Sequence, residues 1–250
     1  MLAARDLVES KGYDALHGIV DSLWLSRPGA TTAQYASLKE LIEKATGYDI
    51  SFEGVYKWVA FLPSKQNEII PVPNRYFGVF EDGKIKDRGI ETRRHDTPPL
   101  FSRFQREVLS IMAKGNNVRE VKALMPQVHD LFLKYKQQLS DGKVPLEDLV
   151  FTKMLSKGSD EYSVNTVETG SIGQLNDEGK TMRAGQVLHY VITNYYRKDT
   201  KKRSVPIELF TEKTSYDARR YIELLAQVCD SVTEPFGYCT QIAASAELVL

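Results

Sequence analysis

Close to its N-terminus the chain reads GYDALHGIVDSLWL over Gly12–Leu25. Apolar residues on both sides of the stretch predict two short strands that meet at a tight, glycine-containing turn. One carboxylate, Asp21, stands where the chain reverses. Because Mg²⁺ commonly takes one or two protein oxygens together with water and phosphate, Asp21 is a candidate metal ligand. The simpler interpretation of Asp21 and Ser22 by themselves is that they favour a turn.

The composition indicates a globular protein with no overall charge. Of its 250 residues 42% are hydrophobic, which suits a substantial core in one large domain or two small ones. Lys and Arg together number 33, as do Asp and Glu, so nucleic-acid binding would depend on local clusters. Cys229 and Cys239 form no CxxC pair, which argues against a zinc site or a disulfide framework and favours a reducing, cytoplasmic setting. No apolar run reaches membrane-spanning length, so we expect no membrane association.

The pattern over residues 1–96 predicts an α+β arrangement. One helix is expected over Leu2–Lys11 and a second from Thr31 or Thr32 to about Thr46. From Ile50 to Ile90 apolar and aromatic residues alternate with a period of two, which predicts an antiparallel meander. We expect the meander and the opening hairpin to complete one sheet that the second helix backs.

We expect the first domain to end just before Pro98 and Pro99, because two prolines exclude both a helix interior and a central strand. Beyond them, over 97–250, the pattern is mainly helical. The expected elements are helices over 100–114, 117–139 with a bend or restart near Pro126, and 218 to about 232, a helical or extended segment at 145–155, and a strand over Val187–Ile192. The polar stretch 158–186 contains several glycines and has weak helix potential.

Three segments in a fixed order carry a family resemblance. They are Leu16–Leu23, Arg75-Tyr76 followed by Gly89–Asp96, and Met182–Ile192. Together they resemble the C-terminal third of family B DNA polymerases, especially the archaeal ones, and the resemblance covers nearly the whole chain. It implies a partial palm domain at 1–96, which contains the third polymerase motif, and a mainly helical thumb domain at 97–250.

The third motif of that family reads Tyr-Gly-Asp-Thr-Asp-Ser, and Asp21 falls on its second Asp. The resemblance therefore implies that Asp21 is a catalytic and metal-binding residue of a site with two Mg²⁺ ions, which carboxylates hold close together for phosphoryl transfer. This chain departs from the motif at three positions, with His17 in place of the Tyr, Ile19 in place of the first Asp and Val20 in place of the Thr. An isoleucine offers no ligand oxygen, so a second carboxylate would have to come from another chain.

The resemblance also implies contacts with DNA from the palm. Arg75 and Tyr76 match the end of a Lys-Lys-Arg-Tyr segment that lies along the minor groove in the family, although Pro73 and Asn74 replace the two lysines. The aromatic residues Phe52, Tyr56 and Trp58 are better explained as palm core than as a base-stacking platform, because alternation along a strand already accounts for them.

Arg93 and Arg94 lie at the implied transition from palm to thumb, where they would reach phosphates; the alternative is local ion pairs with Glu91 and Asp96. In the thumb, basic residues are candidates for sequence-independent contact with the duplex backbone. They are Lys180, Arg183, Arg197, Lys198, Lys201, Lys202 and Arg203. For any single lysine of this set, a charged surface loop is the simpler interpretation.

The 250 residues contain no counterpart of the family's exonuclease domain, first palm motif or fingers helix. We therefore expect a small subunit of a split polymerase, beginning at Met1 one helix before the third motif, which acts with a larger subunit on primer–template DNA and is inactive alone. One alternative is a catalytically inactivated relative kept as a DNA-binding or assembly subunit, which Ile19, Val20, Pro73 and Asn74 favour. Another is a protein-interaction module without salt-sensitive DNA binding.

Overall fold

A computed structural model describes residues 1–19, 21–64, 67–162 and 166–240. The chain divides into two compact units, Met1–Lys86 and Asp87–Leu250, called here the N-terminal and C-terminal units. Helices and antiparallel strands occur in both, which confirms the α+β class. The departure noted at Val20 lies outside the described residues.

The N-terminal unit begins with two helices and a hairpin, in the order α1 (Leu2–Ser10), β1 (Asp14–Ile19), β2 (Ser22–Ser26) and α2 (Thr32–Thr46). Thr31 fixes the start of α2, because its hydroxyl accepts from the Gln34 amide while the Gln34 side chain accepts from the Thr31 amide. Gly47, with φ +74°, ends the helix in the left-handed conformation that favours glycine. Both expected helices are therefore confirmed.

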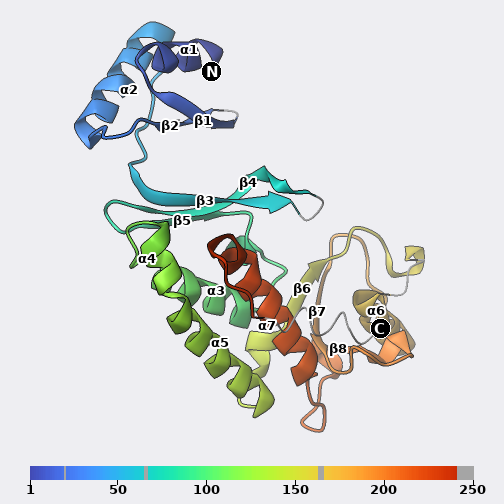
Figure 1. The fold of residues 1–250 in the computed structure, drawn as a ribbon. Helices are drawn as coiled ribbons and strands as arrows, with labels where there is room; N and C mark the ends of the chain where they lie inside the picture. The colour runs from blue at the N-terminus through green and yellow to red at the C-terminus, as the bar shows by residue number, and fades with distance from the viewer. Residues whose placement is uncertain (20, 65–66, 163–165, 241–250) are drawn as a thin grey trace. The chain divides into compact units, whose positions relative to one another are not determined.

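The hairpin has two different faces. Ala15 pairs with Leu25 and His17 with Trp24, so Leu16 is an extra residue that forms a bulge. Leu25 and its neighbours on one face pack against a core cluster from α1, α2 and the segment that precedes β1, and Figure 1 shows both helices on one side of the hairpin. The cluster consists of Val8, Tyr13, Leu38 and Ile42. Gly18 pairs with Leu23 inside the hairpin, so it belongs to β1 rather than to the turn.

The expected meander forms a sheet of three strands, β3 (Tyr56–Ser64), β4 (Asn67–Phe80) and β5 (Ile85–Arg88). The expectation that the opening hairpin joins this sheet is wrong, because β1 and β2 form a separate two-stranded sheet. Side chains make the contact instead of backbone hydrogen bonds. The Trp24 ring stacks on Tyr56 at 5.0 Å between centroids and meets Tyr76 edge-on at 4.8 Å.

The C-terminal unit combines a helical layer with a second three-stranded sheet. Its helices are α3 (Pro99–Met112), α4 (Val118–Ala123), α5 (Met125–Ser140), α6 (Val167–Asp177) and α7 (Ala218–Thr233), and its strands are β6 (Phe151–Met154), β7 (Val187–Ile192) and β8 (Ser204–Pro206). Short 3₁₀ turns cover Glu91–Arg93, Leu146–Leu149, Ser159–Glu161, Thr200–Lys202, Ile207–Leu209 and Glu234–Phe236. Helices α3, α5 and α7 pack together, and α6 lies beside β8 (Figure 1). The expected restart near Pro126 is confirmed.

Helix α6 was not expected, since the sequence around it is polar and rich in glycine. Thr166 caps the helix by accepting from the Thr169 amide. Gly170 lets the helix approach the 3₁₀ turn at Thr200, because a Cβ at this position would lie 2.5 Å from the Thr200 carbonyl oxygen. A tertiary contact thus outweighs the low helix propensity of glycine.

The division between the units falls before the expected boundary after Asp96. Residues 91–93 belong with α3, because the Thr92 amide donates to Gln105 Oε1 at 2.9 Å and the Ser102 hydroxyl donates to the Glu91 carbonyl at 3.2 Å. Among the residues that the structure describes, none of the helices has the length and apolar character needed to cross a bilayer.

Candidate metal centre and nucleic-acid interface

Asp21 lies at the tip of the hairpin, and its side chain is exposed. Ile19 pairs with Ser22, and the Ser22 hydroxyl donates to the Ile19 carbonyl at 3.2 Å, so serine supplies the side-chain hydrogen bond that closes the turn. Within the described part of the chain no hydrogen bond or ion pair involves the Asp21 carboxylate. Its oxygens are therefore available to a ligand from outside.

The described residues place no group of metal ligands around Asp21. A single carboxylate with waters matches the oxygen preference of Mg²⁺, but a centre with two ions needs further carboxylates. The one cluster of three possible ligands among the described residues lies elsewhere, at Asp230, Glu234 and Cys239. There the Asp230 carboxylate already accepts from the Thr240 amide at 2.8 Å and from the Thr240 hydroxyl at 2.9 Å. That cluster anchors the chain after α7 and gives no reason to assign a metal.

The residue at the motif's tyrosine position, His17, packs the hairpin onto the β3–β4 sheet. Its Nε2 lies 3.3 Å from the Pro73 carbonyl oxygen, and its ring lies 5.1 Å from Phe61 between centroids. The period-two geometry of β1 places Ile19 on the same face as His17. These two departures from the motif therefore lie on the side of the hairpin that faces the aromatic side chains of the larger sheet.

Arg75 and Tyr76 make contacts inside the N-terminal unit. Arg75 Nη1 donates to the Pro63 carbonyl at 3.1 Å, so part of its guanidinium is already used within the unit. The Tyr76 side chain is only 2% exposed and packs against Trp24 and Phe61. Tyr56 also packs in this aromatic group, and burial raises the pKa of its hydroxyl above the ordinary range.

Arg93 and Arg94 are neighbours with different partners. Arg94 forms a bidentate ion pair with Asp96, in which Nε and Nη2 lie 2.9 Å and 2.8 Å from the two carboxylate oxygens. This contact raises the pKa of Arg94 and lowers the pKa of Asp96. Arg93 is exposed, and its guanidinium has no partner within the described residues. The alternative of local ion pairing thus describes Arg94 but not Arg93.

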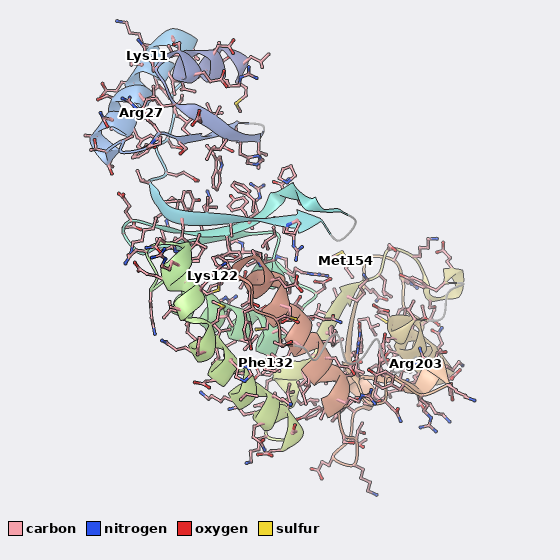
Figure 2. All side chains as sticks on the ribbon, viewed as in Figure 1. Lys11, Arg27, Lys122, Phe132, Met154 and Arg203 are labelled. Atoms are coloured by element: carbon pink, nitrogen blue, oxygen red, sulfur yellow. The ribbon has the colours of Figure 1, made fainter. Side chains whose placement is uncertain are left out.

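The basic residues of the predicted thumb include several that acidic residues neutralise. Lys201 pairs with Asp177 at 3.3 Å and Lys202 with Asp199 at 3.5 Å. Arg203 Nε donates to the Arg197 carbonyl at 2.7 Å, and Figure 2 labels Arg203 where the chain enters β8. Four other side chains are exposed and have no ion pair within the described residues. They are Lys180, Arg183, Arg197 and Lys198.

The sequence did not identify Lys153 on β6 as a basic residue near the predicted contacts. Its charge contributes to the lowered pKa of Asp96. The segment 145–155 offered no signal for this, because it was compatible with either a helix or a strand. The sequence also did not identify Tyr195, Tyr196 and Glu223 as residues near the basic cluster.

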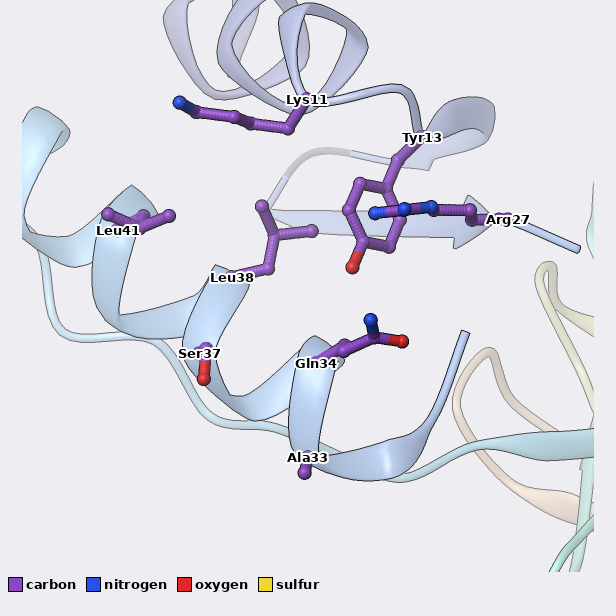
Figure 3. Close-up of a pocket in the computed structure, with 8 residues that line it drawn as sticks. All are labelled: Lys11, Tyr13, Arg27, Ala33, Gln34, Ser37, Leu38 and Leu41. Carbon is purple, nitrogen blue, oxygen red and sulfur yellow. The ribbon is translucent and has the colours of Figure 1, made fainter. Parts of the chain in front are cut away.

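The N-terminal unit also contains a pocket of about 330 Å³, shown in Figure 3. Tyr13 and Leu38 form its floor, and Lys11 and Arg27 lie at its rim. The Arg27 guanidinium lies 5.1 Å from the centre of the Tyr13 ring, so it covers the face of that ring. None of the predicted metal-binding or DNA-binding residues lines the pocket.

The chain was compared with known proteins. The family profile described as DNA polymerase family B matches residues 18–236. DNA polymerase 1 of Saccharolobus solfataricus is 28% identical over 228 residues, which cover 91% of this chain and 24% of the relative. DNA polymerase 1 of Pyrococcus abyssi is 28% identical over an aligned length of 250 residues, and the match covers 95% of this chain and 29% of the relative. The chain thus spans about a quarter of the length of these relatives.

The fold was also compared with solved structures. The structure of the family B DNA polymerase from the hyperthermophilic archaeon Pyrobaculum calidifontis is similar, with a TM-score of 0.66 and 24% sequence identity. The similarity covers 95% of this chain and 28% of that polymerase. At this level of identity the comparison supports the fold.

Proposed function

Since the chain belongs to the family B DNA polymerases, we propose that it contributes one metal-binding carboxylate and a set of DNA-backbone contacts to template-directed DNA synthesis, together with a larger polymerase subunit. In this proposal the N-terminal unit is part of a palm and the C-terminal unit is a thumb. The observation that carries it is Asp21, an exposed carboxylate at a hairpin tip for which the described residues offer no competing partner.

The proposed role of Asp21 is to bind and orient metal ions. Two Mg²⁺ ions, when bound, supply stabilisation of the attacking and leaving oxygens in phosphoryl transfer. Packing of His17 and Trp24 on the β3–β4 sheet fixes the direction of the hairpin that carries Asp21 at its tip. A rigid support of this kind is what a metal ligand needs.

In this proposal the other ligands of such a centre come from a different polypeptide segment, because no group of three possible ligands among the described residues includes Asp21. We assign this contribution to a larger subunit that carries the first palm motif, the fingers and the exonuclease. In the relatives, about three quarters of the sequence lies outside the region matched here, which leaves ample length for segments of this kind.

The proposed DNA contacts come mainly from the C-terminal unit. Of the predicted contacts, the side chains with no ion pair or hydrogen bond to another described residue are the strongest candidates, since their charge is fully available to phosphates. They are Arg93, Lys180, Arg183, Arg197 and Lys198. Lys201, Lys202 and Arg203 would contribute after exchanging an internal partner for DNA. We assign Arg75 and Tyr76 to the interior contacts of the palm.

A primer-extension experiment tests this proposal. The chain is co-expressed with a family B polymerase segment that carries the first palm motif, the fingers and the exonuclease, and Mg²⁺-dependent extension is measured. We expect activity in the complex, loss of that activity with Asp21→Asn, and retention with the control Asp14→Asn, which changes another exposed aspartate of the same hairpin. Normal extension by the Asp21→Asn complex would show that Asp21 is not a catalytic ligand.

A second candidate function is a catalytically inactivated relative that acts as a DNA-binding or assembly subunit. Ile19 favours it, because this residue stands where the family motif has its first Asp and offers no ligand oxygen. Under this alternative the chain binds duplex DNA with an affinity that falls with salt, yet no partner segment produces extension. The same co-expression experiment, combined with a DNA-binding titration, separates the two functions.

A further inference from the structure

Residues 193–203, between β7 and β8, form a segment that we call the basic loop. Its second half contains five cations in seven positions, Arg197, Lys198, Lys201, Lys202 and Arg203. A surface loop with so many like charges tends to be extended and mobile, because its cations repel one another. Here, contacts on both sides hold the loop in place.

Helix α6 holds the end of the loop that leads into β8. Gln174 Nε2 donates to the Ser204 carbonyl at 2.7 Å and also to the Lys201 carbonyl. The Ser171 and Ser204 hydroxyls share a buried hydrogen bond of 2.6 Å. The close approach of Gly170 to Thr200 completes this contact.

Helix α7 holds the other end of the loop through two consecutive tyrosines. The Tyr195 amide donates to Asp217 Oδ2 at 2.8 Å, and the Arg220 guanidinium lies 3.9 Å from the centre of the Tyr195 ring. The Arg219 guanidinium lies 4.6 Å from the centre of the Tyr196 ring. Each tyrosine is thus covered by an arginine of the helix.

Glu223 connects these groups. Its carboxylate accepts hydrogen bonds from the Tyr196 hydroxyl, from Arg219 Nε at 3.2 Å and from Arg220 Nη1 at 3.1 Å. The residue is only 5% exposed. Burial by itself would raise the pKa of the Glu223 carboxyl, but the three hydrogen bonds lower it overall, so the group is ionised at neutral pH. A buried carboxylate with three donors is costly to disturb.

We propose that Glu223 is a positioning residue for DNA binding: it fixes Tyr196, and with it the adjacent Arg197 and Lys198, in the arrangement that contacts the phosphate backbone. The inference rests on the proposed function, since it requires that the basic loop binds DNA. It goes further by assigning a role to a buried acidic residue that itself touches no DNA. Arg197 and Lys198 follow Tyr196 directly, so loss of the Tyr196 hydroxyl contact would remove the side-chain anchor next to both cations.

The sign of the effect of Glu223→Gln distinguishes positioning from simple charge. Removing a negative charge next to a cationic loop would strengthen DNA binding by electrostatics alone. Loss of positioning weakens it. Each phosphate contact contributes about 0.9 to the slope of log K against log salt, which at 0.1 M salt corresponds to about eightfold in affinity. We therefore expect Glu223→Gln to weaken binding about eightfold for each cation that is lost from the interface.

The test uses the full chain and a fluorescein-labelled primer–template duplex, with the dissociation constant measured by anisotropy over a range of salt concentrations. Glu208→Gln is the matched control, because Glu208 is exposed in the same unit and the change in charge is identical. Tyr196→Phe is the second variant. It removes the hydroxyl that Glu223 accepts from but keeps the ring beside Arg219, so it should weaken binding in the same direction even where Glu223→Gln disturbs folding.

A double-mutant cycle completes the test. In the Arg197→Ala/Lys198→Ala background, Glu223→Gln should cause no further loss of affinity, since the cations that it positions are gone. Tighter binding by Glu223→Gln, or an undiminished loss in that background, would overturn the positioning role. If Arg197→Ala/Lys198→Ala itself binds DNA as the parent does, these two cations are not DNA contacts and the positioning role fails, whereas the metal-binding role of Asp21 is tested separately by primer extension.

Discussion

Substitution by alanine is expected to change stability differently at two glycines of α6, Gly170 and Gly173. At Gly170 an added Cβ would lie 2.5 Å from the Thr200 carbonyl oxygen and 3.2 Å from the Lys201 Cα, both backbone atoms that cannot move aside alone. At Gly173 the nearest atom is Lys201 Cε at 3.4 Å, in a flexible side chain. The pair thus separates helix propensity from close packing at two positions of one helix.

The magnitudes follow from these distances. Replacing a helical glycine by alanine gains about 0.8–1 kcal/mol of helix propensity at either position. At Gly170 the overpacked methyl group costs about 1–3 kcal/mol, because α6 and the turn at Thr200 must separate. We therefore expect Gly173→Ala to stabilise the C-terminal unit by roughly 0.5–1 kcal/mol, and Gly170→Ala to be less stable than Gly173→Ala by about 1–3 kcal/mol.

Urea unfolding of the full chain, followed by far-ultraviolet circular dichroism, measures this difference. With a denaturant dependence of about 1–3 kcal/mol per molar, a gap of this size shifts the midpoint by several tenths of a molar or more. The two variants share the propensity term, so the difference between them isolates the contact with Thr200. Equal stabilisation by both variants would refute the close approach of α6 to the basic loop.

Three further predictions concern the proposed DNA contacts. Arg197→Ala combined with Lys198→Ala should reduce the slope of log K against log salt by about 1.8, measured by anisotropy, and an unchanged slope would remove both residues from the interface. Tyr76→Phe should leave DNA affinity unchanged, whereas Tyr76→Ala should cost roughly 3–5 kcal/mol of stability in a urea titration, since the ring is buried. The Arg94 hydrogen bonds lower the pKa of Asp96 in the folded state, so their stabilising contribution is present above the unfolded pKa of about 3.9 and is lost as pH falls through the folded value. Asp96→Asn should therefore make the free energy of unfolding less dependent on pH below about pH 4. If the variant and the parent lose stability equally as pH falls in this range, the assignment is wrong.

Local signals in the sequence were sufficient for most elements. Thr31 and Gly47 mark both ends of α2, and Asp217 marks the start of α7, because capping chemistry depends only on neighbouring residues. The hairpin and the meander were predictable for the same reason, since period-two alternation is read within a few residues. These elements could be predicted because the interactions that define them join residues close together in the sequence.

Sequence patterns failed where the decisive contact is between distant residues. Helix α6 depends on the close fit of Gly170 against Thr200. From the sequence alone, the glycines of this segment argue against a helix, because glycine has a low helix propensity. The hairpin forms a separate sheet and contacts the larger sheet through the stacking of Trp24 on Tyr56. Alternation of apolar and polar residues along a strand does not show whether two strands pair through their backbones or only pack through their side chains. At the candidate site, the sequence indicated Asp21, the basic cluster and local ion pairs as an alternative for Arg93 and Arg94. Side-chain geometry was needed to show that Arg94 pairs with Asp96 while Arg93 does not, and to find the contacts of Glu223.

The pairing of charges also sets a limit on how the chain can hold DNA. Arg94, Lys201 and Lys202 each have a carboxylate partner, and recruiting them to phosphate would break an existing ion pair. Among the predicted DNA contacts, the side chains with neither an ion pair nor a hydrogen bond to another described residue are Arg93, Lys180, Arg183, Arg197 and Lys198. Five phosphate contacts correspond to a salt slope of about −4.5. A steeper slope would mean that further cations, such as Arg203 or the paired Lys201 and Lys202, exchange their internal partners for phosphates, so the slope reports whether these contacts are rearranged on binding.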